Sequence, residues 1–547
     1  MSVSTPPKEE VAEFEAVEKA IIDHVFRLQP GYAVFVGLHE YDGRLPDYSP
    51  AATGRWIAEA DALLRRLLRI SHQDLPRERR MDRTTIGLLL ESPLFDLTEA
   101  RDLERNPMVY VGAPSLTQYM IREYGPVPAR VDAIVRTLEG TPRLLDEGRR
   151  RLRDRLPAPF LKLSLAIGEG LPSHFREAEA FARRFSPELG EKVAAVRPAA
   201  EAAVESFLAR VRDEWTKKAD DDFAMGPTRY QRLLWVREGI TRPFSELLAD
   251  GERDLARNQA RLQEIAQAAT PPVGVPELLE TLYRDHPTAA ELVPTAQRYV
   301  AETRQFVVDR RLVTIPEPDS CRVEETPTYG RALSTASMNP PGPLETSGDE
   351  GIYFVTPIDA AWSPERQEQW LRSLNRPMLR NITAHEVYPG HYLQFLHHRK
   401  GAATLARKVF MSNSFTEGWA HYCEQLCIEA GLGAGSASAE VAELHDALLR
   451  DCRLIVSVGL HTGHMSLEQA TEVLMREAHF ERLPAEREAI RGTFNPEYFC
   501  YTLGKLAILR AREKYLHRRF QGSLMAFHDQ LLSCGAPPVG LLDQLFD

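Results

Sequence analysis

Two histidines and a glutamate in residues 383–392, T-A-H-E-V-Y-P-G-H-Y, are the side chains best suited to chemistry in this chain. In the pattern H-E-x-x-H, two histidines four residues apart share one helix face and bind zinc, while the glutamate activates a zinc-bound water. Here His391 lies six residues after His385. At about 100° per residue, a regular helix would point these two side chains about 120° apart, too far for one ion.

The two residues before His391 can resolve this mismatch. Pro389 has no N–H to donate to the carbonyl of His385, and its ring crowds the preceding turn, so the helix must open there. Gly390 tolerates the backbone angles that would return His391 to the face of His385. We interpret the segment as an H-E-x-x-H site with a two-residue bulge. The alternative is a helix that ends at Pro-Gly with three polar side chains on its surface.

A second motif, residues 414–424 (S-F-T-E-G-W-A-H-Y-C-E), offers a third ligand. A catalytic zinc commonly takes three protein ligands, and His, His and Glu is one established set. Glu417 is therefore the predicted third ligand, with His385 and His391 as the first two. Its alternative role is structural, because Ser414 as an N-cap and Glu417 three residues later have the spacing of a capping box.

The remaining polar residues near these motifs are predicted to support the ligands. His421 follows Glu417 by one helical turn, and we expect it to hydrogen-bond behind the metal, although it is also a rival ligand. Glu424 lies on the same face and can orient an imidazole. His397 and His398 are expected to be surface or packing residues.

The combination H-E-x-x-P-G-H and E-G-W-A-x-Y resembles the bacterial family known as domain of unknown function 885. The similarity extends over most of the chain, through residues 33–42 and 44–47 near the start and residues 459–461 and 501–505 near the end. The resemblance implies a zinc peptidase distantly related to thimet-type oligopeptidases and thermostable carboxypeptidases. In those enzymes a second helix supplies the glutamate ligand.

Composition is that of a large globular enzyme. Of the 547 residues, 43% are hydrophobic and 27% charged, and the net charge of −11 argues against a nucleic-acid surface. We find no apolar stretch of the ~18 residues that a membrane span needs, and no secretory signal, so we expect a cytoplasmic protein with no membrane partner. Six cysteines make no disulfide framework, and Cys423 and Cys427 are interpreted as buried thiols rather than a zinc pair. The oligomeric state stays open.

Apolar residues at spacings of three and four predict an all-α fold. The clearest helices are expected over residues 11–28, 51–70, 128–155, 187–216, 229–240 and 243–269. Residues 220–227 are typical of a seam, which predicts an N-terminal helical region over 1–225 and a catalytic helical region over 226–547, unless the two form one continuous domain. We expect a helical body like that of zinc peptidases, with a deep cleft.

Residues 313–350 are rich in proline and predict a long loop, which in a compact protein is usually functional or disordered. The loop ends at residues 351–356, the best strand candidate, which forms a small β element near the site. An extended peptide could pair with the edge of this strand, so Tyr353 and Phe354 are predicted substrate-binding residues. The alternative is a short strand that only packs on the metal helix.

These parts predict a zinc metallopeptidase that cleaves short peptides with one Zn²⁺ ion. Glu386 would take a proton from the activated water and pass it to the leaving amine. Tyr501 is the first choice for stabilising the oxyanion and His461 the second, with Tyr498 as an alternate that could also bind substrate. Two alternatives remain: a zinc amidase or esterase acting on a small amide or other non-peptide substrate, and a helical scaffold protein whose site is inactive.

Overall fold

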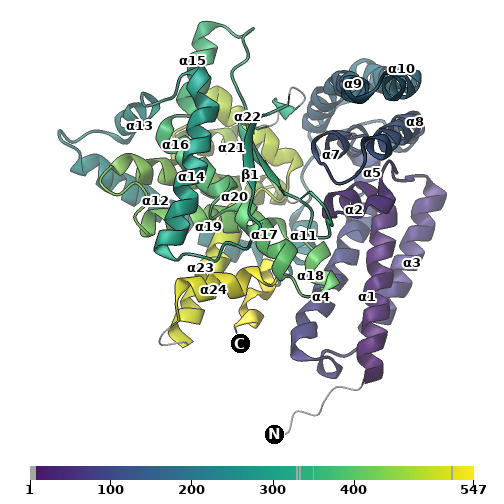
Figure 1. The fold of residues 1–547 in the computed structure, drawn as a ribbon, viewed down its shortest axis with the longest axis horizontal. Coiled ribbons are helices and arrows are strands. Elements are labelled where there is room, and N and C mark those ends of the chain that lie inside the picture. The colour runs from purple at the N-terminus through teal and green to yellow at the C-terminus, as the bar shows by residue number, and fades with distance from the viewer. Residues whose placement is uncertain (1–7, 328–329, 332–333, 349, 519–521, 547) are drawn as a thin grey trace. The chain divides into compact units, whose positions relative to one another are not determined.

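The chain is helical almost throughout, with one small sheet, as the sequence predicts (Figure 1). The structure, a computed structural model, describes residues 8–327, 330–331, 334–348, 350–518 and 522–546. It divides into two compact units. Unit 1 runs to Met225 and also includes residues 341–348 and 404–410, and unit 2 contains the rest. The first boundary falls after Met225, and unit 1 also takes residues 341–348 and 404–410, which the sequence placed in the C-terminal region.

Unit 1 consists of amphipathic helices around its own core. Its second half packs α8, α9 and α10 together over buried residues such as Phe175, Phe207 and Trp215. The start of α10 shows why helices begin where they do, since Ser186 accepts from the N–H of Leu189 and a proline follows it. The α-helices of unit 1 are α1 (Lys8–Leu28), α2 (Pro30–Val36), α3 (Pro50–Leu68), α4 (Arg77–Phe95), α5 (Asp102–Arg105), α6 (Met108–Gly112), α7 (Thr117–Ile121), α8 (Val127–Arg151), α9 (Ala158–Phe185), α10 (Pro187–Arg210) and α18 (Leu405–Val409).

Unit 2 holds both predicted zinc motifs. Helix α16 packs against α14, α19 and α20, and α19 packs along α23. The α-helices of unit 2 are α11 (Pro227–Glu238), α12 (Phe244–Ala268), α13 (Val275–Tyr283), α14 (Leu292–Arg310), α15 (Pro364–Ser373), α16 (Arg376–Glu386), α17 (His391–Gly401), α19 (Asn413–Glu429), α20 (Ala437–Thr462), α21 (Leu467–Glu477), α22 (Arg482–Phe494), α23 (Cys500–Arg518) and α24 (Leu524–Leu532).

The small sheet corrects the prediction of a structureless loop over residues 313–350. That range contains two strands, β1 (Cys321–Glu325) and β2 (Ala336–Asn339), and the predicted strand is β3 (Gly351–Val355). The strand order is β1-β3-β2, with β1 parallel and β2 antiparallel to β3. Because β3 is the central strand, both of its edges are already paired. It cannot accept a peptide by strand addition, and β1 and β2 are the edge strands of this sheet.

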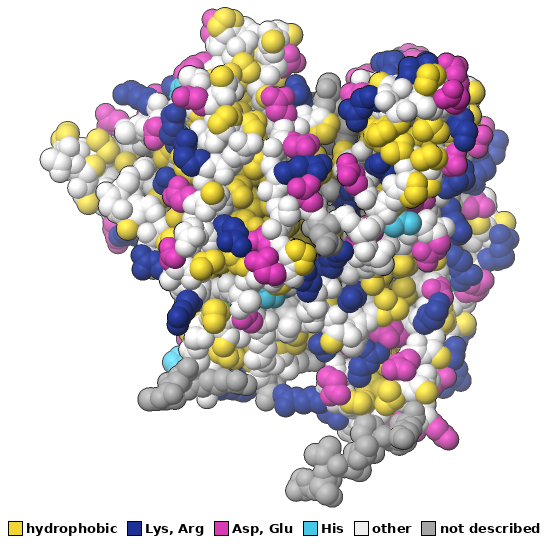
Figure 2. Space-filling model, in the orientation of Figure 1, with side chains coloured by type: hydrophobic (Ala, Val, Ile, Leu, Met, Phe, Trp, Pro, Cys, Tyr) yellow, Lys and Arg dark blue, Asp and Glu magenta, His cyan; other side chains and the backbone are white. Residues whose placement is uncertain are grey.

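Acidic and basic side chains alternate over the face of the molecule drawn in Figure 2, where neither sign forms a continuous field. In the described part of the chain, no helix combines the length and the apolar character that crossing a membrane requires.

Candidate metal centre

The helix that carries His385 breaks before His391, as the bulge interpretation requires. Helix α16 ends at Glu386, and α17 begins at His391. Between them, the N–H of Gly390 donates to the carbonyl of Ala384 (3.0 Å), so this hydrogen bond spans six residues rather than the helical four. The rings of His385 and His391 then lie side by side, with centroids 4.7 Å apart. A break of two extra residues thus brings both imidazoles to one place.

Gly390 is needed for the space that it leaves. Its φ of −73° is outside the left-handed region that favours glycine, but its ψ of −133° is outside both the α and the β region. A Cβ on Gly390 would lie 1.7 Å from the carbonyl oxygen of His385. The chain can fold back onto the end of α16 only because this position has no side chain.

We expect Gly390→Ala to separate the two imidazoles, because the new methyl group forces the backbone away from His385. Zinc affinity should fall by about 10-fold or more, the scale at which displaced supports weaken a metal site. A competition titration with a zinc chelator measures this effect. Gly170→Ala is the matched control, since a Cβ there meets no atom within 4 Å. Equal zinc affinity in both variants would contradict the role assigned to Gly390.

Glu417 completes the group. Its Oε2 atom lies 3.6 Å from Nε2 of His385 and 3.5 Å from Nε2 of His391. These three side chains form the one cluster of histidine, cysteine and acidic ligand atoms that the described residues bring within 4.8 Å of one another. Three ligands about 2.0–2.2 Å from a tetrahedral zinc would lie roughly 3.3–3.6 Å apart, so the donor set and its spacing fit zinc.

The start of α19 removes the alternative role of Glu417 as a capping residue. The N-cap is Ser412, whose Oγ accepts from the N–H of Phe415 (2.8 Å), and not Ser414 as the sequence suggested. Glu238, fully buried, accepts from the N–H of Ser414 (2.9 Å). Glu417 therefore lies beyond the capping turn, and its carboxylate is directed to the histidines.

A buried carboxylate orients the first histidine. Oε1 of Glu424 lies 2.5 Å from Nδ1 of His385, which leaves Nε2 directed at Glu417. Arg450 (2.8 Å) and Asn381 (3.0 Å) donate to the other oxygen of Glu424. This is the carboxylate–histidine arrangement that fixes metal-binding imidazoles. Arg450 and Asn381 lie outside both motifs, so the sequence did not identify them.

Electrostatics around the cluster favour a cation. Burial lowers the pKa of His385, but hydrogen bonds with Glu417 and Glu424 outweigh it and raise that pKa to about 10. Burial also raises the pKa of Glu417, yet the two histidines hold it well below its usual range. The two carboxylates thus stabilise positive charge between them, which a metal ion can provide in place of a proton.

The motif E-G-W-A also explains how α19 approaches its neighbours. A Cβ on Gly418 would lie 2.3 Å from Cα of Gly504, so the two glycines let α19 and α23 cross in close contact. Trp419 donates from Nε1 to the carbonyl of Pro389 (3.0 Å), inside the break. The helix that supplies Glu417 therefore also holds the bulge that places His391.

Two tyrosines anchor the other side of the break. Tyr388 donates its hydroxyl to Asp319, and Tyr392 donates to the carbonyl of Ser320 (2.6 Å) just before β1. Gly351, the first residue of β3, allows this packing because a Cβ there would lie 2.5 Å from the ring of Tyr392. The sheet thus packs on the segment that carries His391, which matches the packing alternative for the predicted strand.

The other predicted residues of the motifs lie at or behind the cluster. Glu386 is partly exposed at the end of α16, next to His385. His421 is fully buried, with Nδ1 3.6 Å from Oε2 of Glu424, and so belongs to the group behind His385. His397 and His398 are buried packing residues rather than surface residues, and Nε2 of His397 lies 2.7 Å from the carbonyl of Thr314.

The residues predicted to stabilise the oxyanion or to bind substrate differ in their exposure and in the hydrogen bonds that they already make. Tyr501 is partly exposed, and burial and the nearby Glu417 carboxylate raise its pKa above the usual range. Tyr498 is 1% exposed and donates its hydroxyl to Glu488, so it has no free hydroxyl to offer a substrate. Nε2 of His461 lies 2.8 Å from the carbonyl of Gly492, which gives this imidazole a structural contact.

Tyr353 and Phe354 are both buried in the central strand. Tyr353 is 0% exposed, and its hydroxyl lies 3.4 Å from Oγ1 of Thr383 in the metal helix. Phe354 is 6% exposed. The direct substrate contacts predicted for these two side chains therefore do not fit the structure, because strand β3 is covered on both edges and its side chains are packed.

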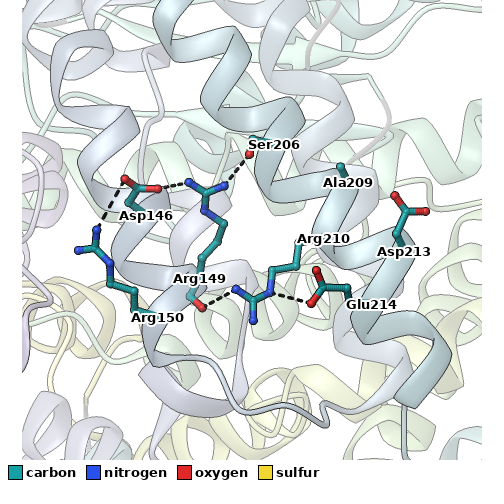
Figure 3. A pocket seen from close by; sticks show the side chains of 8 residues that line it. All are labelled: Asp146, Arg149, Arg150, Ser206, Ala209, Arg210, Asp213 and Glu214. Carbon is teal, nitrogen blue, oxygen red and sulfur yellow. Dashed lines mark hydrogen bonds and ion pairs between the residues drawn. The ribbon is translucent and has the colours of Figure 1, made fainter.

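A hollow on the surface of unit 1 is lined by arginine and acidic side chains that pair with one another, unlike the candidate metal centre (Figure 3). Arg149 donates to Asp146 and to Oγ of Ser206, and Arg210 pairs with Glu214. Three arginines face three acids, so the hollow has no net charge with which to hold a ligand. It is lined by Asp146, Arg149, Arg150, Ser206, Ala209, Arg210, Asp213 and Glu214.

Two solved structures share this fold over almost the whole chain. One is described as "a putative lipoprotein of unknown function from Shewanella oneidensis"; it is 24% identical, with a TM-score of 0.79, over 97% of this chain and 99% of that one. The other, "the putative lipoprotein from Colwellia psychrerythraea", is 18% identical, with a TM-score of 0.82, over 98% of each chain. None of the curated proteins with which the chain was compared matches it.

A family model described as "Bacterial protein of unknown function (DUF885)" matches residues 30–545. The match includes residues 383–392 and 414–424 and all the helices and strands that position them. The family resemblance noted in the sequence is thereby confirmed, and the chain belongs to the DUF885 family of bacterial proteins of unknown function.

Proposed function

We propose that this protein is a zinc metallohydrolase that cleaves peptide bonds in short peptides. The observation that carries the proposal is the convergence of His385, His391 and Glu417 beside a glutamate, Glu386, that is partly exposed. A purely structural metal site needs ligands but no neighbouring base, so Glu386 favours catalysis.

Each group has a defined task in this proposal. When bound, zinc supplies a Lewis acid that polarises the scissile carbonyl and acidifies a water molecule. Glu386 accepts the proton of that water and delivers it to the leaving amine. Tyr501 donates a hydrogen bond from its hydroxyl to the developing oxyanion, and its raised pKa keeps that hydroxyl protonated. Glu424 keeps His385 oriented throughout.

The experiment that tests the proposal joins metal analysis with a peptide-library digest. We expect purified protein to contain stoichiometric zinc and to cleave short peptides. Cleavage should stop when a chelator removes the metal and return when zinc is added. Protein that binds no zinc, or cleavage that a chelator leaves unchanged, would contradict the proposal. Hydrolysis of small amides or esters without peptide cleavage would favour the amidase or esterase, and zinc binding without any hydrolysis would favour the inactive scaffold.

The location of this activity is a separate question. The expected cytoplasmic location stays a prediction, and the description of both structural relatives as a "putative lipoprotein" does not fit plainly with it. Fractionation of cells that express the natural gene, followed by immunodetection of the protein, distinguishes the cytoplasm from an envelope fraction.

A further inference from the structure

Arg491, on α22, is a cation that the structure leaves uncompensated. Its side chain is exposed, and no described carboxylate lies within ion-pair distance of its guanidinium. That guanidinium lies over the ring of Tyr498, 5.4 Å from the ring centroid. Since Tyr498 is itself fixed by its hydrogen bond to Glu488, its ring is a rigid platform that orients Arg491.

Of the two arginines whose guanidiniums lie over the Tyr498 ring, only Arg491 lacks an ion pair with a described carboxylate. Arg453 lies over the same ring at 4.7 Å, but both oxygens of Glu488 accept from it, at 2.9 and 3.2 Å. Glu488 is thereby satisfied by Arg453 and Tyr498. The two guanidiniums and one carboxylate leave a net positive charge, and Arg491 is its exposed end.

This charge is close to the candidate metal centre. Arg453 also lies over the ring of Tyr501, at 5.3 Å from the centroid, so Tyr498 and Tyr501 flank one guanidinium. The pKa of Tyr501 is raised by burial and by Glu417, and lowered by Arg453 and Arg491. The charges of both Glu417 and Arg491 therefore act on the hydroxyl of Tyr501.

We propose that Arg491 binds the C-terminal carboxylate of the substrate, so that the enzyme cleaves short peptides near a free C-terminus. This inference rests on the proposed peptidase function and names its substrate class. A guanidinium held on an aromatic ring matches a carboxylate through two parallel hydrogen bonds. Tyr498 is then a positioning residue for Arg491, which explains why its own hydroxyl is engaged elsewhere.

The test compares trialanine with its C-terminal amide in zinc-loaded Glu386→Gln protein, which is expected to bind peptide but to hydrolyse it at least ~100-fold more slowly. Calorimetry should show trialanine binding about 10-fold or more tightly than the amide, the scale of one charge-assisted hydrogen-bonded pair. In Glu386→Gln/Arg491→Ala the ratio should fall to about 1, and Arg491→Lys should restore part of it. The matched control is Arg482→Ala, because Arg482 is on the same helix but already pairs with Glu468.

An unchanged acid-to-amide ratio in the Arg491→Ala protein, or no binding of trialanine, would overturn the assignment. The C-terminal amide of a peptide with an acidic side chain is a further probe. If it bound as tightly as trialanine, Arg491 would bind a side-chain carboxylate rather than the C-terminal one. Failure of the underlying function has a different signature, since protein with Glu386 intact would then cleave no peptide at all. Equal cleavage of peptides with a free C-terminal carboxylate and of their C-terminal amides would contradict the role of Arg491 but not the proposed peptidase activity.

Discussion

Alanine at His385, His391 or Glu417 is expected to remove stoichiometric zinc from the protein. The three ligand atoms converge on one point from α16, α17 and α19, and no other described cluster offers a replacement donor set. Loss of an outer support alone typically weakens a metal site by 10–100-fold, so loss of a direct ligand should weaken it by more than about 100-fold. Elemental analysis after dialysis, followed by a chelator competition titration, measures the loss.

Two comparisons make this result specific. His517→Ala should keep full zinc, because that histidine is 80% exposed and pairs with Glu513. Glu424→Ala should keep zinc with an affinity lowered by about 10–100-fold, since Glu424 orients His385 without facing the cluster. If Glu417→Ala retained full zinc while His421→Ala lost it, His421 would be the third ligand.

Glu386→Gln is expected to bind zinc normally and to hydrolyse peptides at least ~100-fold more slowly, the usual scale for loss of a general base. Glutamine keeps the size and polarity of the side chain but cannot accept the proton of the attacking water. The measurement is kcat on a cleavable peptide together with zinc content. Glu252→Gln, at an exposed position of α12, controls for the change of one charge.

Two outcomes of this experiment would change the mechanism. Undiminished turnover in Glu386→Gln would show that another group activates the water. Loss of zinc from the same variant would show that Glu386 is a ligand, which the present geometry does not indicate, because Glu417 holds that place.

The amino-acid sequence by itself determined the features that depend on neighbouring residues alone. Apolar spacing identified the long helices, such as α1 and α12, because a helix is stabilised by its own backbone hydrogen bonds and one buried face. The break before His391 was also local information, since Pro389 lacks the N–H that a continuous helix would use. From these features came the expectation that two histidines six residues apart share one site.

Tertiary structure decided everything that depends on which distant segments meet. Glu238 caps α19 and Arg450 holds Glu424, and neither contact leaves a signal in the motifs. Gly390 and Gly418 are glycines because other backbone atoms lie where a Cβ would be, which no local propensity records.

The sheet shows most clearly what the local sequence could not determine. An apolar, β-branched and aromatic composition identifies a strand such as β3, but the local sequence does not show which distant segments pair with it. Strands β1 and β2 lie in a proline-rich range and become strands only by pairing with β3. That pairing covers Tyr353 and makes β3 a brace for the metal helix, because a central strand has no free backbone groups to offer a peptide.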